Sequence, residues 1–286
     1  MRKIPDWIGA SLAVGAFGAL VWLERRRPLR RAVESKLERD ARNLAVAGVA
    51  AAALQFAERP VAERLTALVE RRQVGLLKQV ALPRALEIAL AVVLLDYTLY
   101  VWHVLTHRVP ALWRFHLVHH ADLDLDASTA LRFHFGELVI SVAWRAAQVL
   151  VIGVSPQSLS AWQSLLFVSI LFHHSNVRLP IAVERRLNKF VVTPRMHGIH
   201  HSTVRGERDA NWSSGLTLWD KLHGTLRLNV PQEEIEIGVP AYRAPEELGL
   251  VEILKLPFGA QRPSRQTQDA RTERDALPVP ADHLLA

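Results

Sequence analysis

The chain has 286 residues, half of them hydrophobic, with a formal net charge of +7 and no cysteine. Without cysteine it can form no disulfide, haem–thiolate centre or cysteine-ligated iron–sulfur cluster, so any metal must be held by nitrogen and oxygen. The arginines flank apolar segments, which favours a membrane protein over a nucleic-acid-binding one, and we expect no nucleic-acid partner.

Five apolar stretches predict an all-α integral membrane bundle of four to five transmembrane helices. They cover residues 7–23, 43–57, 85–102, 138–154 and 158–172. A helix needs about 17–25 residues to span a bilayer, so the second and fifth stretches are short. The last two are separated only by residues 155–157, which predicts a helical hairpin. The connection at 58–79 has apolar positions at helical spacing, so we expect a helix lying in the membrane plane.

The charges next to the first stretch predict the orientation. Five arginines follow it directly, at positions 25, 26, 27, 30 and 31, and basic residues remain on the cytoplasmic side. If all five stretches span, the third ends on that side at His103, and the hairpin returns there at His173. We therefore expect a multi-pass protein with its histidine-rich face in the cytoplasm. The Ala- and Arg-rich composition indicates a bacterial inner membrane.

The histidines form four clusters. Eleven of the thirteen fall between His103 and His201, ten of them in the motifs HVLTH, HLVHH, HHSN and HGIHH and the eleventh, His134, alone. Residues three and four apart share one helix face, so each motif directs several imidazoles to one point. Ten such side chains exceed the needs of one ion, which predicts a two-metal site with an almost all-nitrogen shell. The candidate ligands are His103, His107, His116, His119, His120, His173, His174, His197, His200 and His201.

Between residues 85 and 230 these motifs stand in a longer series of blocks. The blocks read DYTLYVWHVLTHRVPALWRFHLVHH, STALRFHFGE, HHSNVRLP, TPRMHGIHHS and NWSSGLTLWDKLHGT. In order and spacing they resemble the fatty acid hydroxylase superfamily, also called the sterol desaturase family. That resemblance implies a non-haem di-iron membrane enzyme, which uses molecular oxygen and two electrons to hydroxylate or desaturate a lipid such as a sterol, fatty acid or carotenoid. Zinc is a possible substitute for iron, because it binds nitrogen sites more tightly.

The resemblance also implies roles beside the ligands. Of the HH pair it favours His174 over His173. His134 and Glu137 match a family HPxE position in which Phe135 replaces the proline, so both are candidates for orienting ligand imidazoles. Asn211 matches a family asparagine near the site, although asparagine before an apolar run is also ordinary turn chemistry. His223 stands where relatives have phenylalanine and is expected to pack, whereas His283 lies in a polar tail.

Other polar and aromatic residues could have either a structural role or a role in supporting the metal ligands. Asp96, inside the third stretch, either bonds a neighbouring helix or orients a ligand histidine. The acidic residues at positions 122, 124 and 126 are expected to form a solvated turn rather than to support the ligands. Arg145 is expected to reach the membrane surface or to pair with Glu137, and Trp212 and Trp219 to pack at headgroup level.

Rival functions would need other motifs. A zinc hydrolase would be expected to carry HExxH or a carboxylate base, and a metal-handling membrane protein would hold its ligands near the bilayer midplane. Neither pattern is present, but both functions stay as alternatives. The sequence contains no dinucleotide fingerprint and no flavin or haem motif, so electrons must come from an external donor, a ferredoxin or a b-type cytochrome with its reductase.

The expected organisation has three parts. Residues 1–84 form N-terminal spans and the in-plane helix, and 85–230 form the catalytic domain. Within it, 103–136 and 174–230 make a helical, histidine-rich cytoplasmic cap. Residues 231–286 form an extension whose last part, 260–286, is polar and expected to be disordered.

Overall fold

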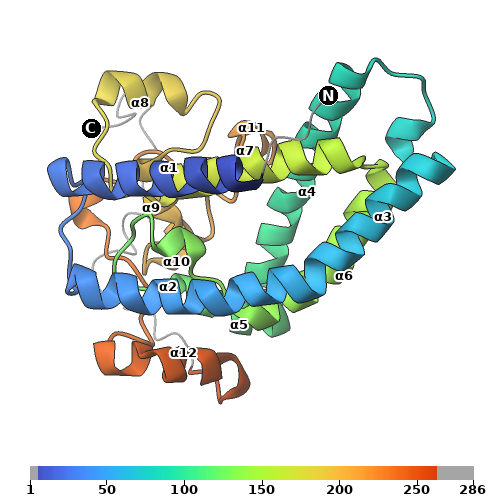
Figure 1. Ribbon diagram of the computed structural model, residues 1–286. Helices are drawn as coiled ribbons and strands as arrows, with labels where there is room; N and C mark the ends of the chain where they lie inside the picture. The colour runs from blue at the N-terminus through green and yellow to red at the C-terminus, as the bar shows by residue number, and fades with distance from the viewer. Residues whose placement is uncertain (1–5, 263–286) are drawn as a thin grey trace.

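A computed structural model describes residues 6–262 of the chain, with side chains from residue 14 onward. Most of the predicted disordered tail, and His283, lie outside these residues. The described part is built of helices, with isolated β-bridges in place of strands, as the all-α prediction requires. In Figure 1 the long helices cross the view, and the short helices of the cap gather at one end of them.

The helices fall into two sets by length. The long ones are α1 (Asp6–Arg26), α2 (Lys36–Ala53), α3 (Arg59–Arg72), α4 (Arg84–Arg108), α6 (Phe135–Ile152) and α7 (Pro156–His174). The shorter ones are α5 (Pro110–His120), α8 (Ile181–Leu187), α9 (Pro194–His200), α10 (Arg205–Arg208), α11 (Leu218–Leu222) and α12 (Leu250–Lys255). Short 3-10 turns include η2 (Leu76–Lys78), η3 (Thr129–Leu131), η4 (Gln232–Glu234), η5 (Pro245–Leu248) and η6 (Leu256–Phe258).

Three helical runs among the described residues are long and apolar enough to cross a membrane, fewer than the predicted four to five. They are Lys36–Lys78, Arg84–Arg108 and Phe135–Ile152. The first joins α2 to α3 through a π-helical turn, η1 (Leu54–Glu58). The predicted short span at 43–57 and the separate helix at 58–79 are therefore parts of one 43-residue run. The reason is local: no glycine lies at the junction, and its one proline, Pro60, stands in the first turn of α3, where proline is tolerated.

The predicted hairpin is a tight turn between two diverging helices. α6 ends at Gly153, whose φ of 82° suits glycine, and α7 begins after Ser155, whose hydroxyl accepts a hydrogen bond from the Ser158 N–H. From this turn the two helices diverge (Figure 1), and α4 packs against both. Leu95 of α4 and Val149 of α6 are fully buried in the core formed there.

A second core joins the cap to the N-terminal and C-terminal segments. Val46 of α2, Leu117 of α5, and Leu248 and Ile253 near α12 are buried together. The extension after residue 230 therefore packs on α2 and α5. The predicted division of the chain into three parts at residues 85 and 231 stays a prediction. Residues from all three parts are buried together in this core.

Candidate metal centre

Eight of the ten predicted ligand histidines form two compact groups at the ends of α4, α5, α7 and α9. In each group the candidate ligand nitrogens all lie within 4.8 Å of one another. The first group is His103, His107, His120 and His200, and the second is His119, His174, His197 and His201. All are buried except His107, which is half-buried.

The paired histidines of HLVHH and HGIHH explain why the two groups are neighbours. Adjacent residues of a helix point in directions about 100° apart. His119 therefore joins the second group and His120 the first. In the same way His200 joins the first group and His201 the second. The rings of His120 and His201 stack across the boundary with centroids 4.2 Å apart.

The nitrogen spacing in the second group fits a common first-row ion. His174 Nε2 lies 3.1 Å from His119 Nε2, and His197 Nε2 lies 3.0 Å from His174 Nε2 and 3.1 Å from His201 Nε2. Two nitrogens that are each about 2.1 Å from one ion lie roughly 3.0–3.4 Å apart. The Nδ1 atoms of His119 and His174 both face backbone carbonyls, so without a shared cation the Nε2 lone pairs of these two residues would face one another inside the protein. The geometry therefore fits a bound metal better than it fits a packed core.

Backbone carbonyls hold several of the imidazoles in the tautomer that a metal needs. His103 Nδ1 lies 2.7 Å from the Trp212 carbonyl, His174 Nδ1 2.7 Å from that of Ile170, and His200 Nδ1 2.9 Å from that of Ala210. A carbonyl only accepts, so each Nδ1 carries the proton and Nε2 keeps its lone pair. The Nε2 atom of His200 is buried and has no hydrogen-bond partner among the described residues, which leaves it available to an ion.

Burial keeps these side chains neutral. Outside the membrane-spanning segments, removal from water lowers the pKa of His119, His120, His197, His200 and His201 well below the usual value, and nearby histidines lower it further. Neutral imidazole is the form that binds metal. The centre is therefore ready to bind ions at neutral pH without first losing protons.

His116 and His173 lie beside the groups rather than inside them. The His116 ring is 4.9 Å from that of His107, and the His173 ring is 4.1 Å from that of His197. Both are buried, and each has at least one ring nitrogen without a partner in the described part of the chain. Eight ligand positions are thus assembled, and the other two predicted ligands border them.

The four residues predicted to orient the ligands have different surroundings. Glu137 Oε1 lies 3.0 Å from His116 Nδ1. His134 instead caps α6, accepting from the Gly136 N–H, and its ring packs against Phe115 and Phe258. Asp96 and Asn211 form hydrogen bonds with groups other than the ligand histidines. Asp96 accepts from the Leu216 N–H and from Trp219 Nε1, and the Asn211 amide donates to the carbonyls of Met196 and Arg227.

Two aromatic predictions are corrected. Trp212 is buried, not at headgroup level, and its ring stands 4.5 Å from His107 and 5.2 Å from His200. Trp219 is also buried, and its indole N–H donates a hydrogen bond to Asp96. His223 stacks on Tyr100 with ring centroids 5.0 Å apart, in line with the expected packing role.

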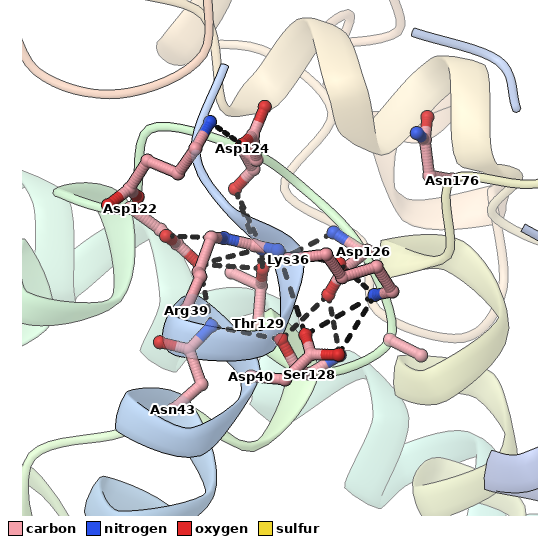
Figure 2. A network of polar contacts seen from close by, with 12 residues as sticks. Lys36, Arg39, Asp40, Asn43, Asp122, Asp124, Asp126, Ser128, Thr129 and Asn176 are labelled. Atoms are coloured by element: carbon pink, nitrogen blue, oxygen red, sulfur yellow. Dashed lines mark hydrogen bonds and ion pairs between the residues drawn. The ribbon is translucent and has the colours of Figure 1, made fainter. Parts of the chain in front are cut away.

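The predicted solvated acidic turn is wrong, because Asp122, Asp124 and Asp126 are all buried. Figure 2 shows the network that holds two of them. Arg39 of α2 donates to both oxygens of Asp122, at 2.8 and 2.9 Å, and to Asp126 at 2.6 Å. Burial alone would raise the pKa of the Asp122 and Asp126 carboxyls. The charge and hydrogen bonds of Arg39, together with Arg132 at Asp122 and Lys36 at Asp126, outweigh this effect and hold both pKa values below their usual values.

This network reaches the metal centre through two residues that sequence reasoning missed. Asn43 donates to Asp122 at 2.9 Å and accepts from Arg132 at 2.7 Å. Arg132 also donates to the Val118 carbonyl, and its own carbonyl lies 3.3 Å from His119 Nδ1. The first turns of α2 thus brace the segment that follows α5. A signal was present in Arg39 and Asn43, which lie four residues apart on one face of a largely apolar helix.

An apolar cavity of about 340 Å³ opens onto the histidines. Its middle is formed by side chains of α4, α6 and α7, and its far end by a buried charge. The lining includes Leu99, Trp102, Leu138, Leu166, Phe167 and Ile170, with His103, His116, His119, His173, His174 and His197 at one end and Glu58, Arg145 and Trp162 at the other. Arg145 does not pair with Glu137 as predicted, because it lies two turns along α6 and meets Glu58 of η1 instead, at 3.5 Å.

Comparison with known proteins adds to this geometry. The Fatty acid hydroxylase family model matches residues 88–225. An ornithine lipid hydroxylase of Rhizobium tropici is 31% identical over 158 residues, which are 55% of this chain and 46% of that protein. An alkylglycerol monooxygenase of Homo sapiens is 30% identical over 131 residues (46% and 28%), and a cholesterol 25-hydroxylase of Mus musculus is 27% identical over 143 residues (49% and 46%).

The match covers less than half the length of each of these three relatives. No solved structure matches the chain significantly. The matched segment nevertheless contains all eight histidines of both groups and most of the cavity lining. Residues 88–225 are thus a fatty acid hydroxylase domain, which agrees with the family expected from the sequence blocks.

Proposed function

We propose that the protein is a membrane-bound di-iron oxidoreductase that hydroxylates or desaturates a lipid with molecular oxygen and two electrons. The observation that carries the proposal is the junction of two buried four-histidine groups with an apolar cavity. The names of the relatives, each a hydroxylase or monooxygenase of a lipid, support a lipid as the substrate class.

The side chains supply binding, orientation and exclusion of water. Two iron ions held by the histidine groups would supply the oxygen chemistry needed to attack an unactivated C–H bond. Leu99, Leu138 and Ile170 would hold an alkyl chain beside the histidines. Trp212 covers the first group, and Glu137 fixes the ring of His116. We include His116 and His173 in the proposed ligand set, since both have free nitrogens at its edge.

The electron donor is proposed to bind the face on which the arginines lie. Arg25, Arg26, Arg27 and Arg31 after α1 are exposed, as is Arg178 after α7. Such a surface suits an acidic redox protein, such as a ferredoxin or a b-type cytochrome with its reductase. The positive-inside rule places this face, and with it the active site, in the cytoplasm.

Metal content and the source of oxygen test the proposal. Protein made with sufficient iron should contain about two irons per chain, since the histidines form two groups. A hydroxylated lipid should carry label from oxygen-18 gas and not from labelled water. A desaturated product would carry no label but should still require oxygen. Turnover without oxygen or an electron donor would instead indicate a zinc hydrolase, in which the metal activates water.

A further inference from the structure

The end of the cavity away from the histidines holds a buried charge in an apolar setting. Arg145 lies on α6 and Glu58 on η1, and both helical runs are candidate membrane spans. Arg145 Nε stands 3.5 Å from Glu58 Oε1, and its guanidinium lies over the Trp162 ring, 4.4 Å from the centroid. Charged groups in a membrane are costly and commonly mark a functional site. Their position in the cavity wall therefore calls for an explanation beyond packing.

Two hydrogen-bond donors at this end lack a close acceptor among the described residues: Trp162 Nε1 has none, and Arg145 Nε has only the long ion-pair contact with Glu58. Arg145 Nε and Trp162 Nε1 are both buried, and within residues 6–262 neither makes a hydrogen bond. Arg145 uses another nitrogen to donate to Gln148, at 3.1 Å. A buried donor without a partner is destabilising, and lipid offers no water to satisfy it. Both residues line the cavity, so a ligand inside it could supply the acceptor.

The charge balance selects the kind of acceptor. Glu58 already offsets the charge of Arg145, and a carboxylate ligand would lie near the Glu58 carboxylate and be repelled. A neutral oxygen, such as an ester carbonyl, an amide carbonyl or a hydroxyl, would satisfy the donors without that repulsion.

The positions along α6 give the approximate separation of the two ends of the cavity. Glu137, which contacts His116, and Arg145 are eight residues apart on one helix, and this corresponds to about 12 Å along its axis. With carbon–carbon bonds of about 1.5 Å, at least roughly eight bonds are needed to cross that distance.

A second cavity indicates where the rest of a head group would lie. It measures about 390 Å³ and shares Leu54, Glu58 and Gln163 with the first. Polar side chains such as Gln55, Thr66 and Ser160 also line it. The polar end of the first cavity therefore lies beside a second space whose wall includes polar side chains. The π-helical turn η1 contributes Leu54 and Glu58 to both cavities, and such turns occur often at functional sites.

We propose that Arg145 and Trp162 bind a neutral oxygen acceptor of the lipid substrate, on the order of eight bonds from the carbon that faces the histidines. The substrate class is thus an ester-, amide- or hydroxyl-bearing lipid, oxidised on its chain far from that oxygen. The statement about oxidation rests on the proposed function. The statement about binding does not.

Binding is tested with three photoreactive probes, each with a diazirine near the chain end: methyl palmitate, palmitate and hexadecane. Purified full-length protein is labelled in detergent, and the labelled peptides are mapped by mass spectrometry. We expect methyl palmitate to label best and to label near the histidine end, on the C-terminal half of α7. Equal labelling by hexadecane would overturn the anchor. Stronger labelling by palmitate would overturn the neutral acceptor.

Matched variants locate the anchor. Trp162→Phe keeps an aromatic side chain but removes the N–H together with part of the indole ring, and it should weaken methyl palmitate labelling roughly three- to tenfold, the effect of one hydrogen bond. Hexadecane labelling should not change. Trp144→Phe is the control, because its indole N–H also lacks a partner but the residue does not line the cavity. An equal effect of Trp162→Phe on both probes would show a packing role and refute the proposal.

The double variant Arg145→Leu/Glu58→Leu removes the ion pair without leaving a buried charge. It should lose the preference for methyl palmitate over hexadecane, and an intact preference would exclude this pair as the anchor. Because labelling needs neither iron nor oxygen, its result is separate from activity. Selective labelling by an enzyme that oxidises no lipid would retain the anchor and reject the proposed function.

Discussion

Replacing Arg39 with methionine should destabilise the protein strongly and lower its iron content. The guanidinium is 2% exposed and donates to Asp122, Asp126 and Thr129 at 2.6–2.9 Å. Without it, two buried carboxylates lose their main cationic partner. Removing one member of a buried ion pair costs about 3–5 kcal/mol, which corresponds to a fall in Tm on the order of 10 °C.

The assay is thermal unfolding in detergent, with iron measured per chain in the same samples. Iron should fall because the chain of contacts from Arg39 through Asn43 and Arg132 holds His119. Arg59→Met is the matched control, since Arg59 is exposed and pairs with Glu63 one turn away on the same helix, a kind of pair worth little. If Arg39→Met unfolded at the same temperature as Arg59→Met and kept its iron, the network would be irrelevant to the centre.

Three further outcomes are expected. The pKa of Asp126 is lowered, so its ion pair stabilises the fold fully above the unfolded pKa of about 3.9, and this stabilisation decreases as the pH falls below that value. The decrease in Tm caused by Asp126→Asn should therefore be smaller at pH 3 than at pH 7. An equal decrease at both pH values would contradict an ionised carboxylate. His200→Ala should lose iron, while His223→Ala, outside both groups, should keep it; the reverse pattern would reject the ligand assignment. Reporter tags near Leu123 and near Arg205 should both face the cytoplasm and one near Gln157 the opposite side, and tags at the first two on opposite faces would rule out a single centre.

The candidate ligand residues could be predicted because the histidines of each motif lie close together in the sequence. HLVHH and HGIHH each place three imidazoles within one and a half turns, so helical spacing alone indicates a shared site. The sequence could not show that His119 and His120 serve different groups, since that depends on where α7 and α4 approach α5. Apolar runs likewise located α4 and α6, but not the π-helical turn that joins α2 to α3.

The network around Arg39 that supports the candidate metal centre could not be predicted, because its partners are far apart in the sequence. Arg39 and Asp122 are 83 residues apart, and an aspartate just after a helix is ordinarily solvated. The partner of Arg145 was missed for a similar reason, because Glu58 lies on a different helical run. In both cases an isolated charge near an apolar segment was visible, whereas its counterion was set by tertiary packing.

The distance between Arg39 and its partners also bears on how the protein is made. A ribosome adding about 5–20 residues per second needs roughly 4–17 s to pass from Arg39 to Asp122. During that interval Arg39 has none of its carboxylate partners from the 122–126 segment, so its guanidinium must stay in contact with water or other polar groups. Docking of the 121–132 segment then satisfies the arginine and sets His119 in place in one event. The support that this network gives to His119 is therefore complete only after residue 132 has been made.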